Sequence, residues 1–363
     1  MDTHPTPSSS HPVPAGSTRP PPAAAAARLA WVDVAKGVGM ILVVFGHVLG
    51  GLIASGTLPA AGNQHVYDWV YSFHMPAFML LSALFLEASL AKRGIAVFAT
   101  DRVKTLYYPA LLWGLGSWCL GLVFQKYLNT QMNPWEPLRL LVDPLGSFWF
   151  LRTLLVLSLI YAVLRVARVP RPVMLVAAAA GAAACIGQGW TLDSRLLTIA
   201  WYGAWLVLGV MLSRHVLATG ERAPVWALAL AAVVGAAGVS LLLPPSTPGL
   251  ISPSPLCAPF GVVLMLCSSM VLAKVPGVRE ALSLIGRRSL EVFLVSGIAS
   301  VALRMLLTRV AHVSDGWVLL TACTLAGLVV PLALAEFCER AGIGYVFRFA
   351  PAPARPRVAA VRT

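Results

Sequence analysis

Residues 31–53 read WVDVAKGVGMILVVFGHVLGGLI, an apolar run long enough to cross a bilayer as a single helix. Two ionisable side chains, Lys36 and His47, interrupt this run. At 3.6 residues per turn their separation returns the chain to nearly the same helix face, with the two side chains about 16 Å apart in depth. Because an ionisable group in hydrocarbon costs several kcal/mol, both residues are functional candidates.

The composition of the whole chain agrees with a membrane protein. Of its 363 residues, 58% are hydrophobic and only 11% are charged, and the mean hydropathy is +0.79. These values exclude an ordinary soluble domain. The apolar runs are about twenty residues long and do not alternate, a pattern typical of membrane helices rather than barrel strands. The sequence therefore predicts an all-α, polytopic membrane protein.

The apolar runs predict about ten transmembrane helices. Their expected ranges are 31–53, 67–87, 105–125, 147–164, 172–190, 196–213, 224–243, 256–273, 289–308 and 316–337. We see no internal repeat in this order. A Pro-rich stretch, PPSTPGLISPSP at 244–255, reads as an outer connection between two of the spans.

Basic residues fix the expected orientation. With the N-terminus inside, 20 of the 27 Lys and Arg residues fall in inner segments, four fall outside and three lie within spans. This asymmetry predicts that both termini are cytoplasmic and explains the net charge of +13 without a nucleic-acid partner. The outer residues are Lys126, Arg139, Arg195 and Arg309, and those within spans are Lys36, Arg152 and Arg304.

The two ends of the chain differ from its middle. Residues 1–28 are rich in Pro, Ser and Ala and lack the pattern of a signal peptide, so we expect a disordered cytoplasmic tail. Residues 341–363 form a basic cytoplasmic tail, which leaves 29–340 as the transmembrane domain. The six cysteines show no metal-ligand spacing and read as small core residues, so we predict no metal site.

A second histidine is expected near His47. In YSFHMPAF, His74 lies six or seven residues into the second expected helix, which places it at a depth similar to that of His47. Pro76 predicts a kink at this point. The following inner segment brings Arg102 and Lys104 to the level of Lys36. The sequence thus predicts a basic cluster inside and a pair of imidazoles farther out.

Each of these residues also has a plain structural interpretation. His47 alone is equally consistent with a hydrogen bond between helices. Lys36 is equally consistent with a side chain that reaches the headgroups or pairs with Asp33, three residues earlier. Arg102 and Lys104 agree with the inner basic residues of any membrane protein.

Five sequence blocks in order resemble the membrane-bound acyltransferase 3 family, over about residues 29–340. Within it they are most similar to the fucose-4-O-acetylase branch and to the exopolysaccharide acetyltransferases that modify polymers such as xanthan. The blocks are WVDVAKGVGMILVVFGHVL, FHMPAFMLLSALFL, RVKTLYYP, GSFWFLRTLLV and LIGRRSLEVFLVS. The spacing of a basic residue and a histidine, here Lys36 and His47, is the strongest single motif.

The resemblance implies a reaction and a set of site residues. Similar enzymes use an acyl-CoA from the cytoplasmic side to O-acylate a carbohydrate hydroxyl, and we expect acetyl-CoA as the donor. The family's motif residues carry over to His47, Lys36, His74, Arg102, Lys104 and Trp149. Relatives often place a histidine near the position of Ser296. This chain has a serine there, so the resemblance does not carry a proton-handling role to the span 289–308. Glu291 either substitutes electrostatically or simply pairs with a nearby arginine.

The expected mechanism follows from the predicted depths of these residues, with the basic cluster inside and the two imidazoles farther out. Lys36, Arg102 and Lys104 would hold the phosphates or the thioester end of the donor. His47 would act as general base or, in a rival route, carry the acetyl group covalently. His74 or Arg152 would stabilise the oxyanion.

The acceptor expected from the resemblance is a sugar hydroxyl, with mannose in an exopolysaccharide repeat favoured, on a lipid-linked or membrane-proximal glycan. Other surface glycans and secondary metabolites are alternatives within the family. The expected location is the inner membrane of a bacterium, among its lipids. A transporter or flippase with buried ionisable residues is the rival class, and a structural membrane subunit is a third option.

Overall fold

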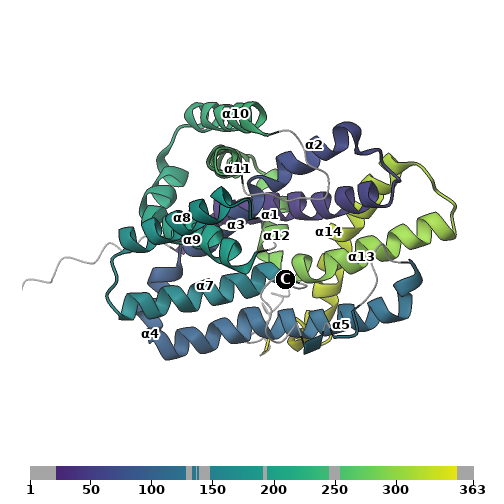
Figure 1. Cartoon of the computed structure of the whole chain (residues 1–363), viewed down its shortest axis with the longest axis horizontal. Coiled ribbons are helices and arrows are strands. Elements are labelled where there is room, and N and C mark those ends of the chain that lie inside the picture. Colours follow the sequence, from purple (N-terminus) through teal and green to yellow (C-terminus); the bar gives the residue numbers. More distant parts are fainter. Residues whose placement is uncertain are drawn as a thin grey trace, which may run out of the picture.

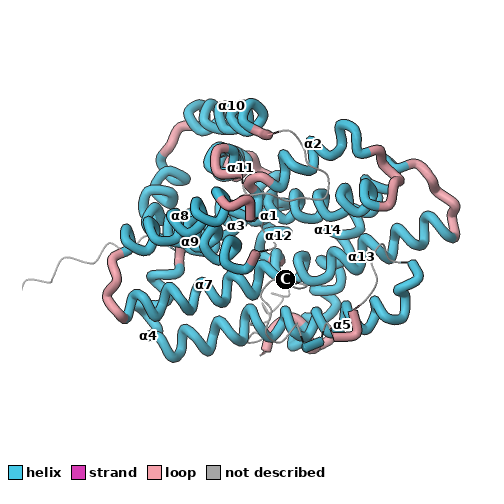
Figure 2. The backbone as a smooth tube through the Cα atoms, in the orientation of Figure 1, coloured by secondary structure: helices cyan, strands magenta, loops and turns pink. Residues whose placement is uncertain are grey.

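In a computed structural model of the chain, helices joined by short loops make up the described residues, and no strand occurs among them (Figure 2). The all-α prediction is therefore confirmed. The described ranges are 22–127, 133–135, 137–138, 148–190, 194–244 and 254–349. Most of the expected N-terminal tail, the Pro-rich connection from 245 to 253 and the last part of the C-terminal tail, from 350, lie outside these ranges.

The α-helices follow one another through the chain as α1 (Pro22–Ala54), α2 (Ala60–Tyr71), α3 (His74–Ala83), α4 (Leu86–Arg102), α5 (Tyr108–Phe124), α7 (Trp149–Val166), α8 (Arg171–Gly187), α9 (Arg195–Arg222), α10 (Val225–Leu242), α11 (Cys257–Leu272), α12 (Val278–Arg287), α13 (Ser289–Arg309) and α14 (Gly316–Arg340). A π-helix, η1 (Val103–Tyr107), joins α4 to α5, and short 3₁₀ turns occur at η2 (Gln125–Tyr127) and η3 (Gly344–Val346). Because α1 begins at Pro22, it takes in the end of the expected N-terminal tail.

The described helices include 7 that are long and apolar enough to cross a membrane, which confirms a multi-pass membrane protein. Two shorter apolar helices, α8 and α11, add to them. The total of ten spans and the cytoplasmic position of both termini stay predictions. The 7 ranges are Ala30–Ala54, Leu86–Phe124, Trp149–Val166, Arg195–Arg222, Val225–Leu242, Ser289–Arg309 and Gly316–Arg340.

The expected span 67–87 is broken into α2 and α3. The helix leaves regular geometry at Phe73, whose φ is −139° and ψ −25°. Pro76 explains the break, because in a continuous helix its ring would clash with the carbonyl group of Ser72. At the start of α3, by contrast, its missing N–H costs nothing, since the first N–H groups of a helix have no partner within it. The predicted kink is therefore present, one turn before the proline.

The expected inner loop between the second and third spans is wrong, because this segment is helical. It forms α4, which is kinked at Gly94 (φ 72°) and passes through η1 into α5. Figure 1 shows α4 and α5 in line along one edge of the molecule. Hydropathy separates apolar from polar segments, but it does not separate a polar helix from a loop.

Helix α1 packs against neighbours so closely that their backbones touch. A Cβ atom added to Gly286 of α12 would lie 1.8 Å from the carbonyl oxygen of Asp33, and one added to Gly37 would lie 2.1 Å from that of Leu282. Small residues at such crossings allow close approach of membrane helices. Gly37 and Gly286 thus fix the position of the half of α1 that carries Lys36 against α12.

A second pair of glycines on α1, Gly46 and Gly50, receives two aromatic rings. An added Cβ at Gly46 would lie 2.7 Å from Cε2 of Tyr71, and one at Gly50 would lie 2.7 Å from Cε2 of Tyr67. The two tyrosine rings stack on each other with their centroids 4.1 Å apart. The Gly-x-x-x-Gly spacing on α1 therefore matches the four-residue spacing of the tyrosines on α2.

One ionic network joins the first turn of α4, the end of α7 and the start of α8. Glu87 of α4 accepts hydrogen bonds from Tyr161 of α7, from Arg165 at 3.2 Å and from Arg171 of α8 at 2.8 Å. This network connects three helices through one carboxylate. Since a carboxylate bonded by several donors is strongly favoured in its charged form, it holds their ends together.

The first residues of the expected C-terminal tail pack against the helices. The carbonyl oxygens of Tyr345 and Val346 accept hydrogen bonds from Tyr108 Oη and Trp113 Nε1 of α5, both at 2.9 Å. Phe347 is buried and stacks on Trp113, with ring centroids 5.3 Å apart. The described part of this segment is therefore bound to α5.

The contact between α1 and α12 gives a direct test. Gly286→Ala places a methyl group against a backbone carbonyl that cannot move without its helix, so we expect the variant to lose about 1–3 kcal/mol of stability. Gly297→Ala is the matched control, because an added Cβ there meets nothing within 4 Å. Thermal unfolding in detergent measures both. Equal melting temperatures for the two variants would contradict the packing described.

Candidate functional site

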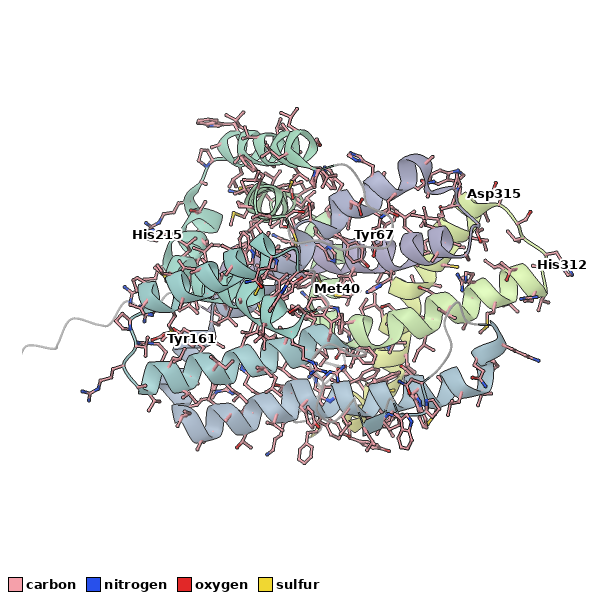
Figure 3. All side chains as sticks on the ribbon, in the orientation of Figure 1. Met40, Tyr67, Tyr161, His215, His312 and Asp315 are labelled. Carbon is pink, nitrogen blue, oxygen red and sulfur yellow. The ribbon has the colours of Figure 1, made fainter. Side chains whose placement is uncertain are left out.

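Two cavities lie along α1. The inner cavity, of about 210 Å³, is lined by Lys36, Met40 and Val43 of α1 and by residues of α3, η1, α7 and α13. The outer cavity, of about 230 Å³, is lined by His47 and its neighbours on α1 and by residues of α13 and α14. Met40, which lines the inner cavity, and Tyr67 of α2 are both labelled in Figure 3.

The two cavities follow the same pair of helix faces. On α1 the lining positions include 36, 40, 43, 47 and 51, and on α13 they include 289, 293, 296, 300 and 304. Both series advance by four, three, four and four residues, which is the spacing of one helix face. The predicted common face of Lys36 and His47 is thus present, and two separate cavities lie where this face of α1 meets α13.

His47 is exposed on the outer cavity and contacts a tyrosine. Its Nδ1 lies 3.3 Å from the hydroxyl oxygen of Tyr71. If Nδ1 carries the proton and the tyrosine oxygen accepts it, the lone pair remains on Nε2, as a general base requires. Because a hydroxyl can also donate, the contact orients the imidazole ring and is compatible with either tautomer.

Sequence reasoning missed Tyr71, although the residue lies in the YSFHMPAF block. Its ring also lies edge-on to His74, with centroids 4.8 Å apart, and so stands between the two histidines. The signal that would have found it is the pairing of Tyr67 and Tyr71, at helical spacing, with the Gly-x-x-x-Gly motif of α1. The predicted proximity of the two histidines is thus realised through a third side chain.

His74 is buried, with 2% of its surface exposed. Its Nδ1 lies 2.7 Å from the carbonyl oxygen of Val70, at the break between α2 and α3. Because a carbonyl only accepts hydrogen bonds, Nδ1 must carry the proton, and a neutral ring then has no N–H left at Nε2. The geometry therefore disfavours the expected role of His74 as a hydrogen-bond donor to an oxyanion and favours a role in positioning.

Of the expected basic cluster, Lys36 lines the inner cavity, whereas Arg102 and Lys104 are not among its lining residues. Lys36 lines the cavity and its Nζ lies 4.0 Å from Asp33 Oδ1, at the limit of an ion pair. Thr105 and Leu106 of η1 line the same cavity, directly after Arg102 and Lys104 in the chain. The π-helical turn here is a geometry that occurs often at functional sites.

The side chains of Arg102 and Lys104 each lie over an aromatic ring. The guanidinium of Arg102 is 4.9 Å from the centroid of Phe98, and Nζ of Lys104 is 5.3 Å from that of Phe349. Such contacts orient a cation while leaving its hydrogen-bond donors for another partner. Lys104 is exposed, whereas Arg102 is partly buried.

Trp149 and Arg152 lie in the first turn of α7. Trp149 packs on Tyr202 of α9, with ring centroids 5.2 Å apart, and Arg152 is 5% exposed. Phe150 and Leu151 line the inner cavity beside Lys36. The first turn of α7 is therefore level with the turn of α1 that carries Lys36. Hydropathy predicts the length of a span, whereas contacts between helices decide its offset.

Ser296 and Glu291 have different environments on α13. Ser296 lines the outer cavity, at the position where a histidine was considered. Glu291 is 2% exposed and its Oε1 lies 3.2 Å from Nη2 of Arg348. Of the two interpretations of Glu291, this ion pair supports the simple one, a partner for an arginine.

Comparison with known proteins adds to the geometry. A family model described as "Acyltransferase domain" matches residues 29–336. The chain is 30% identical over 122 residues to the nodulation protein NolL of Mesorhizobium japonicum, a match that covers 33% of this chain and 31% of NolL. The chain thus aligns with about a third of the length of that relative. No solved structure matches.

The different burial of the two histidines predicts different reactivity. In detergent-solubilised protein we expect diethyl pyrocarbonate to modify His47, which is exposed on its cavity, but not His74, which is buried and bonded to Val70. Mass spectrometry of the peptides measures both rates, with the exposed His65 of α2 as the internal reference. Modification of His74 as fast as that of His47 would contradict this geometry.

Proposed function

The chain belongs to the acyltransferase 3 family, and from this premise we propose that it transfers an acetyl group from acetyl-CoA to a sugar hydroxyl. The observation that carries the proposal is the arrangement of Lys36 and His47 in successive cavities on one face of α1. A cation at one cavity and an imidazole at the next suit a reaction in which a charged donor meets a hydroxyl acceptor.

The inner cavity suits the donor. Its lining is mostly apolar, with Met40, Phe78 and Phe293 among the residues, and so suits the thioester end of a pantetheine arm with a short acyl group. Lys36 on the cavity, with Arg102 and Lys104 on the adjoining turns, offers cations to the CoA phosphates.

The outer cavity suits the acceptor hydroxyl. Nε2 of His47 takes the hydroxyl proton as the oxygen attacks the thioester carbonyl, and the proton then passes to the departing CoA thiolate as the C–S bond breaks. Tyr71 holds the imidazole through Nδ1. Arg152, a buried cation near the inner cavity, remains our candidate for the oxyanion; losing such a group costs about 100- to 1,000-fold in rate.

A covalent route through acetyl-His47 uses the same residues. In that route the imidazole attacks the thioester first, and the hydroxyl takes the acetyl group in a second step. Radiolabelled acetyl retained on denatured protein in the absence of acceptor distinguishes the covalent route from direct transfer.

The resemblance supports an acceptor in surface polysaccharide, and we propose mannose in an exopolysaccharide repeat on a lipid-linked or membrane-proximal glycan. The corresponding location is the bacterial inner membrane. The chain's membrane-helix character fits an acceptor that stays near the bilayer.

Replacing the proposed base tests the function. We expect His47→Ala to lower acetyl transfer by about 10²- to 10⁴-fold, the usual contribution of a general base. The readout is the O-acetyl content of extracellular polysaccharide in a deletion strain complemented at matched protein level, together with transfer from labelled acetyl-CoA by purified protein. His65→Ala, a histidine exposed on α2, is the matched control. Full acetylation by His47→Ala would refute the role of His47, and specific uptake without transfer would favour a transporter.

The tyrosine contact predicts a smaller effect. Tyr71→Phe removes one neutral hydrogen bond but keeps the ring packed on Gly46, so we expect kcat to fall by about 2- to 10-fold. The KM for acetyl-CoA should stay unchanged, because Tyr71 does not line the inner cavity. Steady-state kinetics on the purified enzyme measure both constants. An unchanged kcat would show that the hydroxyl does not orient His47.

A further inference from the structure

The outer cavity contains a cation that the proposed chemistry does not use. Arg304 of α13 lines this cavity together with His47. Its Nη1 donates a hydrogen bond to the carbonyl oxygen of Gly51 at 3.3 Å, and its side chain is partly buried. Sequence reasoning placed Arg304 inside a span but assigned it no role.

The position of Arg304 relative to His47 is fixed by α1. Gly51 lies one helical turn beyond His47 on the same face, which corresponds to about 6 Å along the axis. The guanidinium bound to Gly51 is therefore one turn away from the imidazole. A sugar whose hydroxyl meets His47 would place another of its substituents, or its neighbouring residue, within reach of Arg304.

The charge of the outer cavity is one-sided. Its described lining includes the arginine and the histidine but no carboxylate. One of its two hydroxyls, that of Ser300, is bonded to the carbonyl oxygen of Cys323 at 2.8 Å. Asp315, which opens the neighbouring helix α14, is used as a cap by the N–H groups of Trp317 and Val318. A partly desolvated arginine in such surroundings favours an anion.

The size of the outer cavity limits what it holds. About 230 Å³ corresponds to about eight water molecules at liquid density and to the small end of ligand sites. It therefore holds one sugar residue rather than a chain. Gly297 contributes to this space, because an added Cβ there would meet nothing within 4 Å.

We propose that the outer cavity is the acceptor site and that Arg304 selects an anionic glycan, in which a carboxylate or phosphate lies on the acetylated sugar or on its neighbour. This inference rests on the proposed function and deepens it. The planar guanidinium binds either anion through two parallel hydrogen bonds, whereas a neutral sugar gains no such contact. Arg304 is then a specificity-determining residue one turn from the proposed base.

Kinetics with matched acceptors test the inference. Purified full-length protein in lipid nanodiscs is given labelled acetyl-CoA and three mannose-containing oligosaccharides: a neutral one, one with a neighbouring uronic acid, and one with a sugar phosphate. We expect a lower KM for at least one anionic acceptor than for the neutral one. Arg304→Gln should raise that KM by about 10- to 100-fold, as expected for the loss of a hydrogen bond to a charged group. The uronate and phosphate acceptors distinguish the two sources of charge.

Two comparisons separate recognition from other effects of the substitution. Arg304→Gln should leave the KM for acetyl-CoA unchanged, because Arg304 does not line the inner cavity, and should raise the KM of the anionic acceptor by a larger factor than that of the neutral one. Arg304→Lys should be intermediate, because it keeps the positive charge but not the planar pair of donors. Gly297→Leu fills the cavity where a side chain meets open space and should raise the KM of every acceptor without changing that of acetyl-CoA. This variant tests the location of the site even where Arg304→Gln does not fold.

The possible outcomes are distinct. Equal KM values for charged and neutral acceptors in the wild type overturn the inference but leave the proposed function in place. A fall in kcat by the same factor for all acceptors in Arg304→Gln also overturns it and assigns the arginine to the transition state. Unchanged acceptor kinetics in Gly297→Leu reject the cavity as the acceptor site. Failure of the wild type to acetylate any of the three acceptors overturns both proposals.

Discussion

The contact of α1 with its neighbours through glycine is the constraint on which the site depends. Gly37 and Gly286 allow the backbones of α1 and α12 to touch, and Gly46 and Gly50 receive the rings of Tyr71 and Tyr67. In a bilayer, helices gain little from the hydrophobic effect against one another, so such close packing decides which faces meet. The packing that fixes α1 also brings a tyrosine hydroxyl to Nδ1 of His47.

The break between α2 and α3 places the second histidine. Pro76 prevents a continuous helix, and the carbonyl group of Val70 then accepts a hydrogen bond from the ring of His74. Tyr71, in the last turn before the break, stands between His74 and His47. The break between α2 and α3 thus gives the buried imidazole of His74 a hydrogen-bond acceptor, and it places the ring of Tyr71 next to those of both histidines.

The two cavities between α1 and α13 contain the polar groups that remain. Lys36 lines the inner cavity, of about 210 Å³, and both His47 and Arg304 line the outer cavity, of about 230 Å³. A cation at one cavity, and an imidazole with a second cation at the other, are the physical basis of the proposals that a charged donor binds at the inner cavity and an anionic acceptor at the outer one.

The sequence by itself determined the helical membrane class, the common face of Lys36 and His47, and the kink near Pro76, because each depends on local hydropathy, helix periodicity or proline geometry. It did not reveal that α4 is helical, that α7 begins level with Lys36, or that Tyr71 and Arg304 share the surroundings of His47. Those features depend on the offset and facing of helices far apart in the chain. Only tertiary packing decided them, since hydropathy measures how apolar a segment is and carries no information about which neighbour it meets.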